Sequence, residues 1–152
     1  MTDKEQKKMN DRLIKICHKV HKNIDDIGKL IAMGADINCY CSSIGNTPLI
    51  VSLSTCYHYN SIDNYNACKL LLECGASVDV QNQYGNTALM YSIYDVNIMK
   101  LVLKYDPDIY LVNELNENVL TMCNNNGYSE QNNILQKHIE GGFDTDSLKI
   151  SV

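Results

Sequence analysis

Two short segments of the chain are nearly identical, and this repetition restricts the fold more than any other feature of the sequence. Residues 45–53 have the sequence GNTPLIVSL, and residues 85–93 have the sequence GNTALMYSI. Each is followed by a second apolar stretch, at 67–80 and at 97–112. A pattern that recurs at this spacing is typical of proteins built from stacked copies of one small unit.

Local signals predict two helices in each unit. Thr47 and Thr87 precede the first helix and can accept hydrogen bonds from its free N–H groups. Pro48 suits the first helical position, because no intrahelical bond needs its missing N–H. Gly34 and Gly75 follow the second helix, where a left-handed residue commonly ends a helix. One helix pair cannot bury its own apolar face, so the units must stack on their neighbours.

The two ends of the chain carry altered copies of the unit. A helix over residues 4–20, polar on one side, is predicted to cap the N-terminal end. The last unit is rich in Asn and is predicted to cap the C-terminal end. We expect one domain over residues 1–152, with units at about 10–44, 45–84, 85–115 and 116–147. A Tyr-rich insertion at 55–66 lengthens the second unit.

The helix starts T-P-L and T-A-L, together with the segment LLECGA at 71–76, resemble the ankyrin repeat. That unit runs about 33 residues and begins with T-P-L-H. The resemblance covers about residues 24–144 and implies an all-α solenoid of helix-turn-helix units with hairpin-like turns. Ile50 and Met90 stand where the family usually has His, which ties neighbouring loops together. Asp106 and Pro107 replace the Gly-Ala of the third unit, and Pro107 biases Asp106 away from helical geometry.

Composition restricts the partners that a chain of this kind can have. Of its 152 residues 45% are hydrophobic and 20% are charged, and the net charge is −5. An acidic balance argues against nucleic acid, whose binding rests on clustered Lys and Arg. No apolar run approaches the roughly 18 residues of a membrane span, and the polar start does not resemble a signal peptide. Seven cysteines, most within apolar stretches, favour a reducing compartment. We therefore expect a cytoplasmic protein without a nucleic-acid or membrane partner.

The candidate catalytic and metal sites lack the arrangement that their chemistry needs. Cys39 and Cys41 could hold zinc together with Cys56 and His58, but a helix of about eight residues would separate the two pairs by about 12 Å. Cys17 and His21 are four residues apart, yet no third catalytic group accompanies them. No phosphate-binding or hydrolase motif occurs. We expect no enzyme activity, no cofactor and no metal.

The family resemblance implies a concave binding surface, made by the turn tips and the exposed positions of the first helices. Tyr84 and Tyr94 are its predicted aromatic anchors. The insertion is either a tolerated surface loop or a contact loop that offers Tyr57 and Tyr59. The predicted binding residues are Ser43, Ile44, Asn46, Ser54, Thr55, Tyr57, Tyr59, Gln81, Gln83, Tyr84, Asn86, Tyr94, Asp95, Glu114, Leu115 and Glu117.

Asn38 is a candidate modification site. The spacing of Leu30, Asp36 and Asn38 matches the pattern around a hydroxylatable Asn in ankyrin-type turns, so the resemblance implies a site for an asparaginyl hydroxylase. In the alternative interpretation, the Asp36 and Asn38 side chains hold the turn by bonding to the backbone.

The sequence is compatible with two functions. The first is a monomeric module that binds another protein, acting as a regulator or as a host-directed effector of a virus or intracellular organism in the host cytoplasm. The second is a structural or assembly subunit that self-associates through the same surface.

Overall fold

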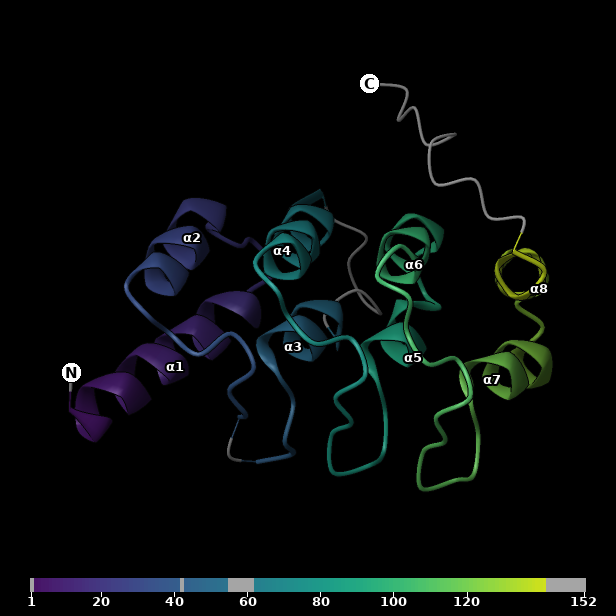
Figure 1. Ribbon diagram of the computed structural model, residues 1–152, viewed down its shortest axis with the longest axis horizontal. Helices are drawn as coiled ribbons and strands as arrows, with labels where there is room; N and C mark the ends of the chain where they lie inside the picture. The colour runs from purple at the N-terminus through teal and green to yellow at the C-terminus, as the bar shows by residue number, and fades with distance from the viewer. Residues whose placement is uncertain (1, 42, 55–61, 142–152) are drawn as a thin grey trace.

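The protein is a stack of helix pairs in two rows. The computed structural model describes residues 2–41, 43–54 and 62–141. One row holds α1, α3, α5 and α7, and the other holds α2, α4, α6 and α8 (Figure 1). The helices are α1 (Asp3–Cys17), α2 (Ile24–Ala32), α3 (Pro48–Ser54), α4 (Ile62–Glu73), α5 (Ala88–Ser92), α6 (Val96–Leu103), α7 (Val119–Asn126) and α8 (Ser129–Ile139). The described residues contain no strand, and the predicted all-α repeat fold is confirmed.

Three loops project from the row of α3, α5 and α7 (Figure 1). We call residues 35–47, 76–87 and 107–118 the first, second and third finger. Within each finger a backbone hydrogen bond joins equivalent positions of its two arms. These bonds run from Cys41 N to Asn46 O (2.9 Å), from Asn82 N to Asn86 O (3.0 Å) and from Asn113 N to Glu117 O (3.0 Å). The first finger holds one more residue between these two positions than the other fingers do.

The predicted helix ends are present. The hydroxyl oxygens of Thr47 and Thr87 each accept a bond, at 3.3 Å, from the N–H three residues ahead. Helix α3 begins at Pro48. After α4, Gly75 takes a left-handed φ of +92°, and after α6 Asp106 takes the same kind of conformation with φ +50°. Pro107 follows Asp106 and disfavours a right-handed helical conformation there.

Two predicted boundaries are wrong. The N-terminal helix ends at Cys17, not at residue 20, because the chain turns and the Lys22 ammonium donates to Lys19 O at 2.8 Å. The loop predicted at 55–66 ends earlier, because α4 already begins at Ile62, while the insertion itself stays a prediction. Asn64 is buried in that first turn and accepts a hydrogen bond from the buried Lys22, while Tyr65 packs against the core. Tertiary contacts therefore extend the helix into a segment whose Asn and Asp content predicts a loop.

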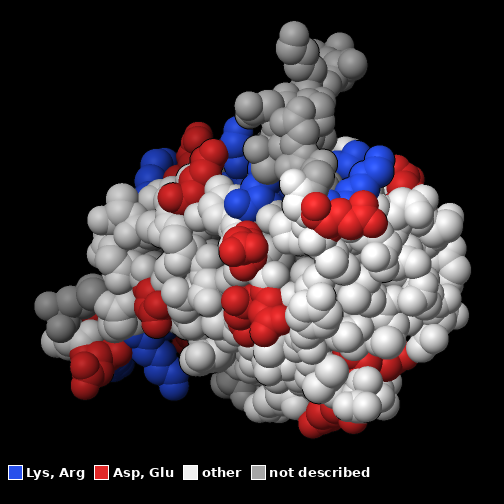
Figure 2. Space-filling view, turned by 45° about the vertical axis from the view of Figure 1, so that its right-hand side comes forward, with Lys and Arg blue, Asp and Glu red and all other residues white. Residues whose placement is uncertain are grey.

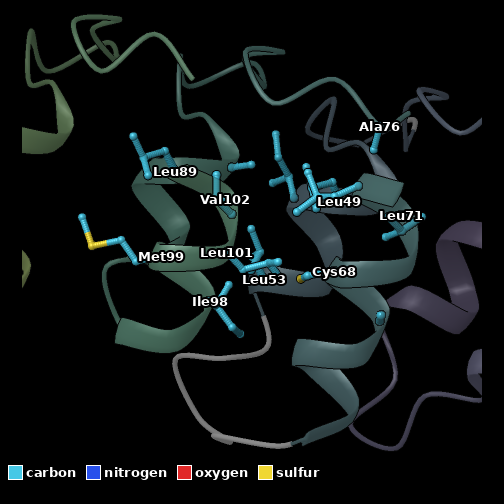
Figure 3. Packing of buried hydrophobic residues seen from close by; sticks show 14 of the residues in the cluster. Leu49, Leu53, Cys68, Leu71, Ala76, Leu89, Ile98, Met99, Leu101 and Val102 are labelled. Carbon is cyan, nitrogen blue, oxygen red and sulfur yellow. The ribbon is translucent and has the colours of Figure 1, made fainter. Parts of the chain in front are cut away.

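The core runs between the two rows. Leu49 and Leu53 of α3 lie near Cys68 and Leu71 of α4, and side chains of α5 and α6 continue the same layer (Figure 3). Each of these four residues is fully buried. The apolar interior is thus shared between successive pairs, as a repeat stack requires.

A buried asparagine joins the second finger to the first. The Asn82 Oδ1 atom accepts the N–H groups of Tyr84 and Asn86, both at 3.0 Å. Its Nδ2 group donates to Asn46 Oδ1 at 2.8 Å and to the Tyr91 hydroxyl at 3.2 Å. Because Asn82 is only 6% exposed, these bonds satisfy an amide that is largely shielded from water.

The third finger repeats this arrangement one unit further along. Asn113 Oδ1 accepts the N–H groups of Leu115 and Glu117 at 3.0 Å, and its Nδ2 donates to Asn86 Oδ1 at 3.1 Å. We call Asn46, Asn82, Asn86 and Asn113 the asparagine ladder. It links neighbouring fingers in a chain that has Ile50 and Met90 in place of the family's usual His.

Replacing Asn82 with Ala should lower the free energy of unfolding by about 2–4 kcal/mol, because buried partners lose their hydrogen bonds. Its neighbour Gln83 is exposed, so Gln83→Ala should change that free energy by less than about 0.5 kcal/mol. Urea unfolding followed by circular dichroism measures both. Equal stability of the two variants would contradict the structural role of the ladder.

A pair of glycine variants should reveal how closely the fingers pack. Gly45 and Gly85 have nearly equal φ angles, +70° and +73°, so Ala strains both backbones alike. A Cβ at 85 would lie 2.7 Å from Asn113 Cα, whereas the nearest atom of the described residues to a Cβ at 45, Gln83 Cγ, is 3.4 Å away. Gly85→Ala should therefore destabilise the protein by about 1–3 kcal/mol more than Gly45→Ala. Thermal unfolding of the two variants side by side tests this, and equal losses would refute the close packing.

Candidate functional site at the finger tips and first helices

Each finger ends in an apolar residue followed by one residue with positive φ. The apolar tip residues are Ile44, Tyr84 and Leu115, and the left-handed residues after them are Gly45, Gly85 and Asn116. Ile44 is half-buried, but Tyr84 is 51% exposed and Leu115 is 77% exposed. The tips thus place three apolar side chains at equivalent positions of successive units.

Backbone hydrogen bonds hold these tips next to one another. Gln83 N donates to Ile44 O at 3.0 Å, and Glu114 N donates to Tyr84 O at 2.9 Å. Each tip is therefore fixed to the next by one backbone bond in addition to the asparagine ladder. The result is an ordered row of tips rather than three independent loops.

Two predicted binding residues belong to the ladder instead of the open surface. Asn46 is 4% exposed, and its Oδ1 accepts the Asn82 amide. The Asn46 side chain thus serves the packing of the fingers, and its contact with a partner stays a prediction. Asn86 is half-buried, and its Oδ1 accepts the Asn113 amide. The sequence alone places Asn46 and Asn86 beside the tips, but it does not show that their side chains bond to the neighbouring finger.

Three further predicted binding residues of the first two fingers are accessible. Ser43 and Gln83 are exposed. Gln81 is also exposed, but its Nε2 group donates to Gly85 O at 2.7 Å and to Val112 O at 2.8 Å. Gln81 thus joins the two arms of its own finger and connects them to the third finger.

The C-terminal end of α5 adds an aromatic edge to the surface. Tyr94 is 36% exposed, and its ring packs edge-on against Tyr128, with ring centroids 6.1 Å apart. Asp95 follows and caps α6 by accepting N–H bonds from Asn97 and Ile98. Tyr94 therefore has a packing role as well as an exposed part, which the sequence did not reveal because Tyr128 lies in another unit.

The third finger carries the acidic part of the surface. Glu114 is exposed, and Glu117 is half-buried with its Oε1 accepting the Asn125 amide at 2.9 Å.

In the second unit Ser54 is half-buried and its hydroxyl donates to Val51 O at 2.9 Å. Thr55, Tyr57 and Tyr59 lie outside the described residues. Whether the insertion is a tolerated surface loop or a contact loop therefore stays a prediction.

Asn38 occupies a defined place in the first finger. Its backbone N–H donates to Asp36 Oδ1 and its own Oδ1 accepts the N–H of Ser77, both at 2.9 Å. The bonds of the alternative interpretation are thus present, and they reach into the second unit. Asp108 N donates to Asp79 Oδ1 in the same way one unit later, at 2.9 Å. Hydroxylation of Asn38 stays a prediction.

The cysteines of the first unit differ in their surroundings. Burial raises the pKa of Cys17 to about 11 and that of Cys39 to about 12. Cys41 is half-buried; this desolvation works against ionisation, but N–H groups of the turn and the Ser43 hydroxyl lower its pKa below the ordinary value. Of the zinc set considered above, Cys56 and His58 lie outside the described residues.

Comparison with known proteins identifies the family. A model described as ankyrin repeats, in three copies, matches residues 7–113 and 58–146. Together these matches cover most of the chain. The chain belongs to the ankyrin-repeat family. Ankyrin repeats are protein-interaction modules, a family role that does not depend on catalysis.

Relatives of this repeat protein occur in viruses. The chain is 36% identical over 99 residues to R664 of Acanthamoeba polyphaga mimivirus, named as an ankyrin repeat protein. It is 37% identical over 83 residues to FPV232 of fowlpox virus, named in the same way. The matches cover 64% and 54% of this chain, but only 59% of R664 and 17% of FPV232.

The helices of the stack are short. In the part of the chain that the structure describes, none is long and apolar enough to cross a bilayer.

Cys41 should react with iodoacetamide faster than Cys39 at pH 7.5. A lowered pKa leaves more thiolate at neutral pH, whereas the raised pKa of Cys39, about 12, keeps that thiol protonated. As pH rises from 6, alkylation of Cys41 should therefore increase and level off first. Peptide mass spectrometry of the native protein measures the rate at each site, and faster alkylation of Cys39 would contradict the assignment.

Proposed function

We propose that this ankyrin-repeat protein binds a partner protein through its finger tips and the exposed ends of its first helices. The observation that carries the proposal is the row of Ile44, Tyr84 and Leu115. Apolar and aromatic side chains held at the surface are typical of the residues that supply binding energy at interfaces. Tyr84 and Leu115 are more than half exposed, so neither is accounted for by the protein's own core.

The asparagine ladder supports this assignment because it orders the surface before a partner arrives. A preformed surface loses less conformational entropy on binding than a flexible loop does. The Tyr84 backbone is bonded on both sides, to Asn82 Oδ1 through its N–H and to Glu114 N through its carbonyl. A side chain on such a backbone can contribute contact area at low entropic cost.

We further propose that the partner belongs to a host cell, because relatives occur in mimivirus and in fowlpox virus. The chain would then act in the host cytoplasm as a monomer that binds one partner. A structural subunit that self-associates through the same row of tips is the alternative. Size-exclusion chromatography coupled to light scattering across a range of concentrations separates these two functions.

Changing Tyr84 and Leu115 together to Ala should weaken partner binding at least about tenfold without changing helical content. Both side chains are exposed, so their loss costs the core little. Tyr94 is a poorer choice, because its removal also breaks the contact with Tyr128. A partner is first identified by affinity purification with the wild-type chain, and its dissociation constant is then measured by calorimetry with purified components.

Tyr110→Ala is the matched control. Tyr110 is 62% exposed, but it lines a hollow beside Asp79 and His138 rather than the row of tips. Its replacement should change binding less than twofold. Equal affinity of the wild type and the Tyr84 and Leu115 double variant would overturn the proposed surface, and concentration-dependent self-association blocked by that variant would favour the assembly subunit.

A further inference from the structure

We infer that the partner segment bound at the finger tips presents a Lys or Arg beside an apolar side chain. This inference rests on the proposed function and specifies the chemistry of its partner. It follows from how the charges of residues 30–141 are divided between the second helices of the units and the fingers.

Between α2 and residue 141, Lys and Arg are confined to the second helices of the units. From residue 30 to residue 141 the lysines are Lys69 in α4, Lys100 in α6, Lys104 at its end and Lys137 in α8, and no Arg occurs. The three fingers, α3, α5 and α7 therefore contain neither Lys nor Arg. The fingers and the end of α5 do contain carboxylates, among them Asp95, Glu114 and Glu117.

The division of charge is visible on the surface. In Figure 2 the basic side chains gather along the upper edge of the molecule and at its lower left, where α1 contributes them. Acidic side chains also lie on the middle and lower parts of the same face. The lower part is the side on which the fingers project in Figure 1.

The carboxylates near the tips are not neutralised by basic side chains of the described residues. The ion pairs of those residues join Asp26 to Lys29, His21 to Asp63 and Lys69 to Glu73. All three pairs lie away from the tips, on α2, on α4 or between α4 and the segment after α1. Within the described part of the chain, Glu114 and Glu117 take part in no such pair. A face of one charge sign attracts the opposite sign and disfavours a like-charged partner.

Glu114 lies directly beside the apolar tips. It precedes Leu115, and its backbone N–H donates to Tyr84 O at 2.9 Å. One short segment of a partner could thus place an apolar side chain against Tyr84 and Leu115 while a neighbouring Lys or Arg meets Glu114 or Glu117. An acidic segment would instead bring like charges together during desolvation, which is unfavourable.

The test is selection of short peptides from a random phage-displayed library on the full chain, followed by titration of selected synthetic peptides. We expect the selected sequences to be enriched in an apolar or aromatic residue within three positions of Lys or Arg. Their affinity should fall as salt is raised from 50 to 300 mM, because screening weakens exposed charge pairs. Selection of acid-rich sequences, or of no peptide at all, would overturn the inference.

A pair of charge-matched variants completes the test. Glu114→Gln with Glu117→Gln should weaken peptide binding about five- to tenfold and reduce its salt dependence. The amide that replaces the Glu117 carboxylate keeps an oxygen acceptor for Asn125. Glu130→Gln with Glu140→Gln removes the same charge from exposed positions at α8 and should change affinity less than twofold. Equal effects of the two double variants would overturn the inference.

The proposed function is tested separately in the same assay. If peptides without Lys or Arg bind and the Tyr84 and Leu115 double variant loses them, the surface stands and the inferred charge of its partner is wrong. If the selected peptides bind that double variant as well as they bind the wild type, the surface itself is wrong.

Discussion

The predicted binding surface depends on the buried side-chain amide of Asn82, which makes hydrogen bonds in two directions. Asn82 uses its oxygen to close its own finger and its nitrogen to reach the preceding one, and Asn113 does the same one unit later. A carboxylate could accept the N–H groups within the finger, but it has no hydrogen to donate to the preceding finger. The second and third fingers are therefore each shaped and positioned by a single Asn side chain.

The first finger lacks that amide and is held by other groups. Cys41 stands at the base position of Asn82, and its backbone bond spans one more residue. Its sulfur accepts N–H groups of the turn, as the Asn oxygen does elsewhere, and this lowers its pKa. Earlier on the same arm, the N–H of Asp36 donates to the Asn10 Oδ1 atom of α1 at 2.9 Å. Helix α1 thus replaces a preceding finger with side chains of its own.

Much of the fold could be predicted from sequence because its signals are local. Thr47, Thr87 and Pro48 act within a few residues of themselves, and the repetition itself predicts a stack. The ladder could not be predicted, because the sequence does not show which of many Asn side chains meet across more than 25 residues. For this reason the sequence pattern places Asn46 at the surface. The start of α4 is equally hidden, because Lys22, far away in sequence, binds the buried Asn64.

The same distinction applies to the candidate site. Tip residues could be located from sequence because the family resemblance implies where the turns lie, and Tyr84 and Leu115 are exposed there. The sequence does not show which exposed residues also hold the fold together, and Gln81 and Tyr94 are two examples. Both are partly exposed, yet Gln81 joins two fingers and Tyr94 packs on Tyr128. The residues with no such internal role, Tyr84, Leu115 and the Glu114 carboxylate, are those that the fold leaves available to a partner.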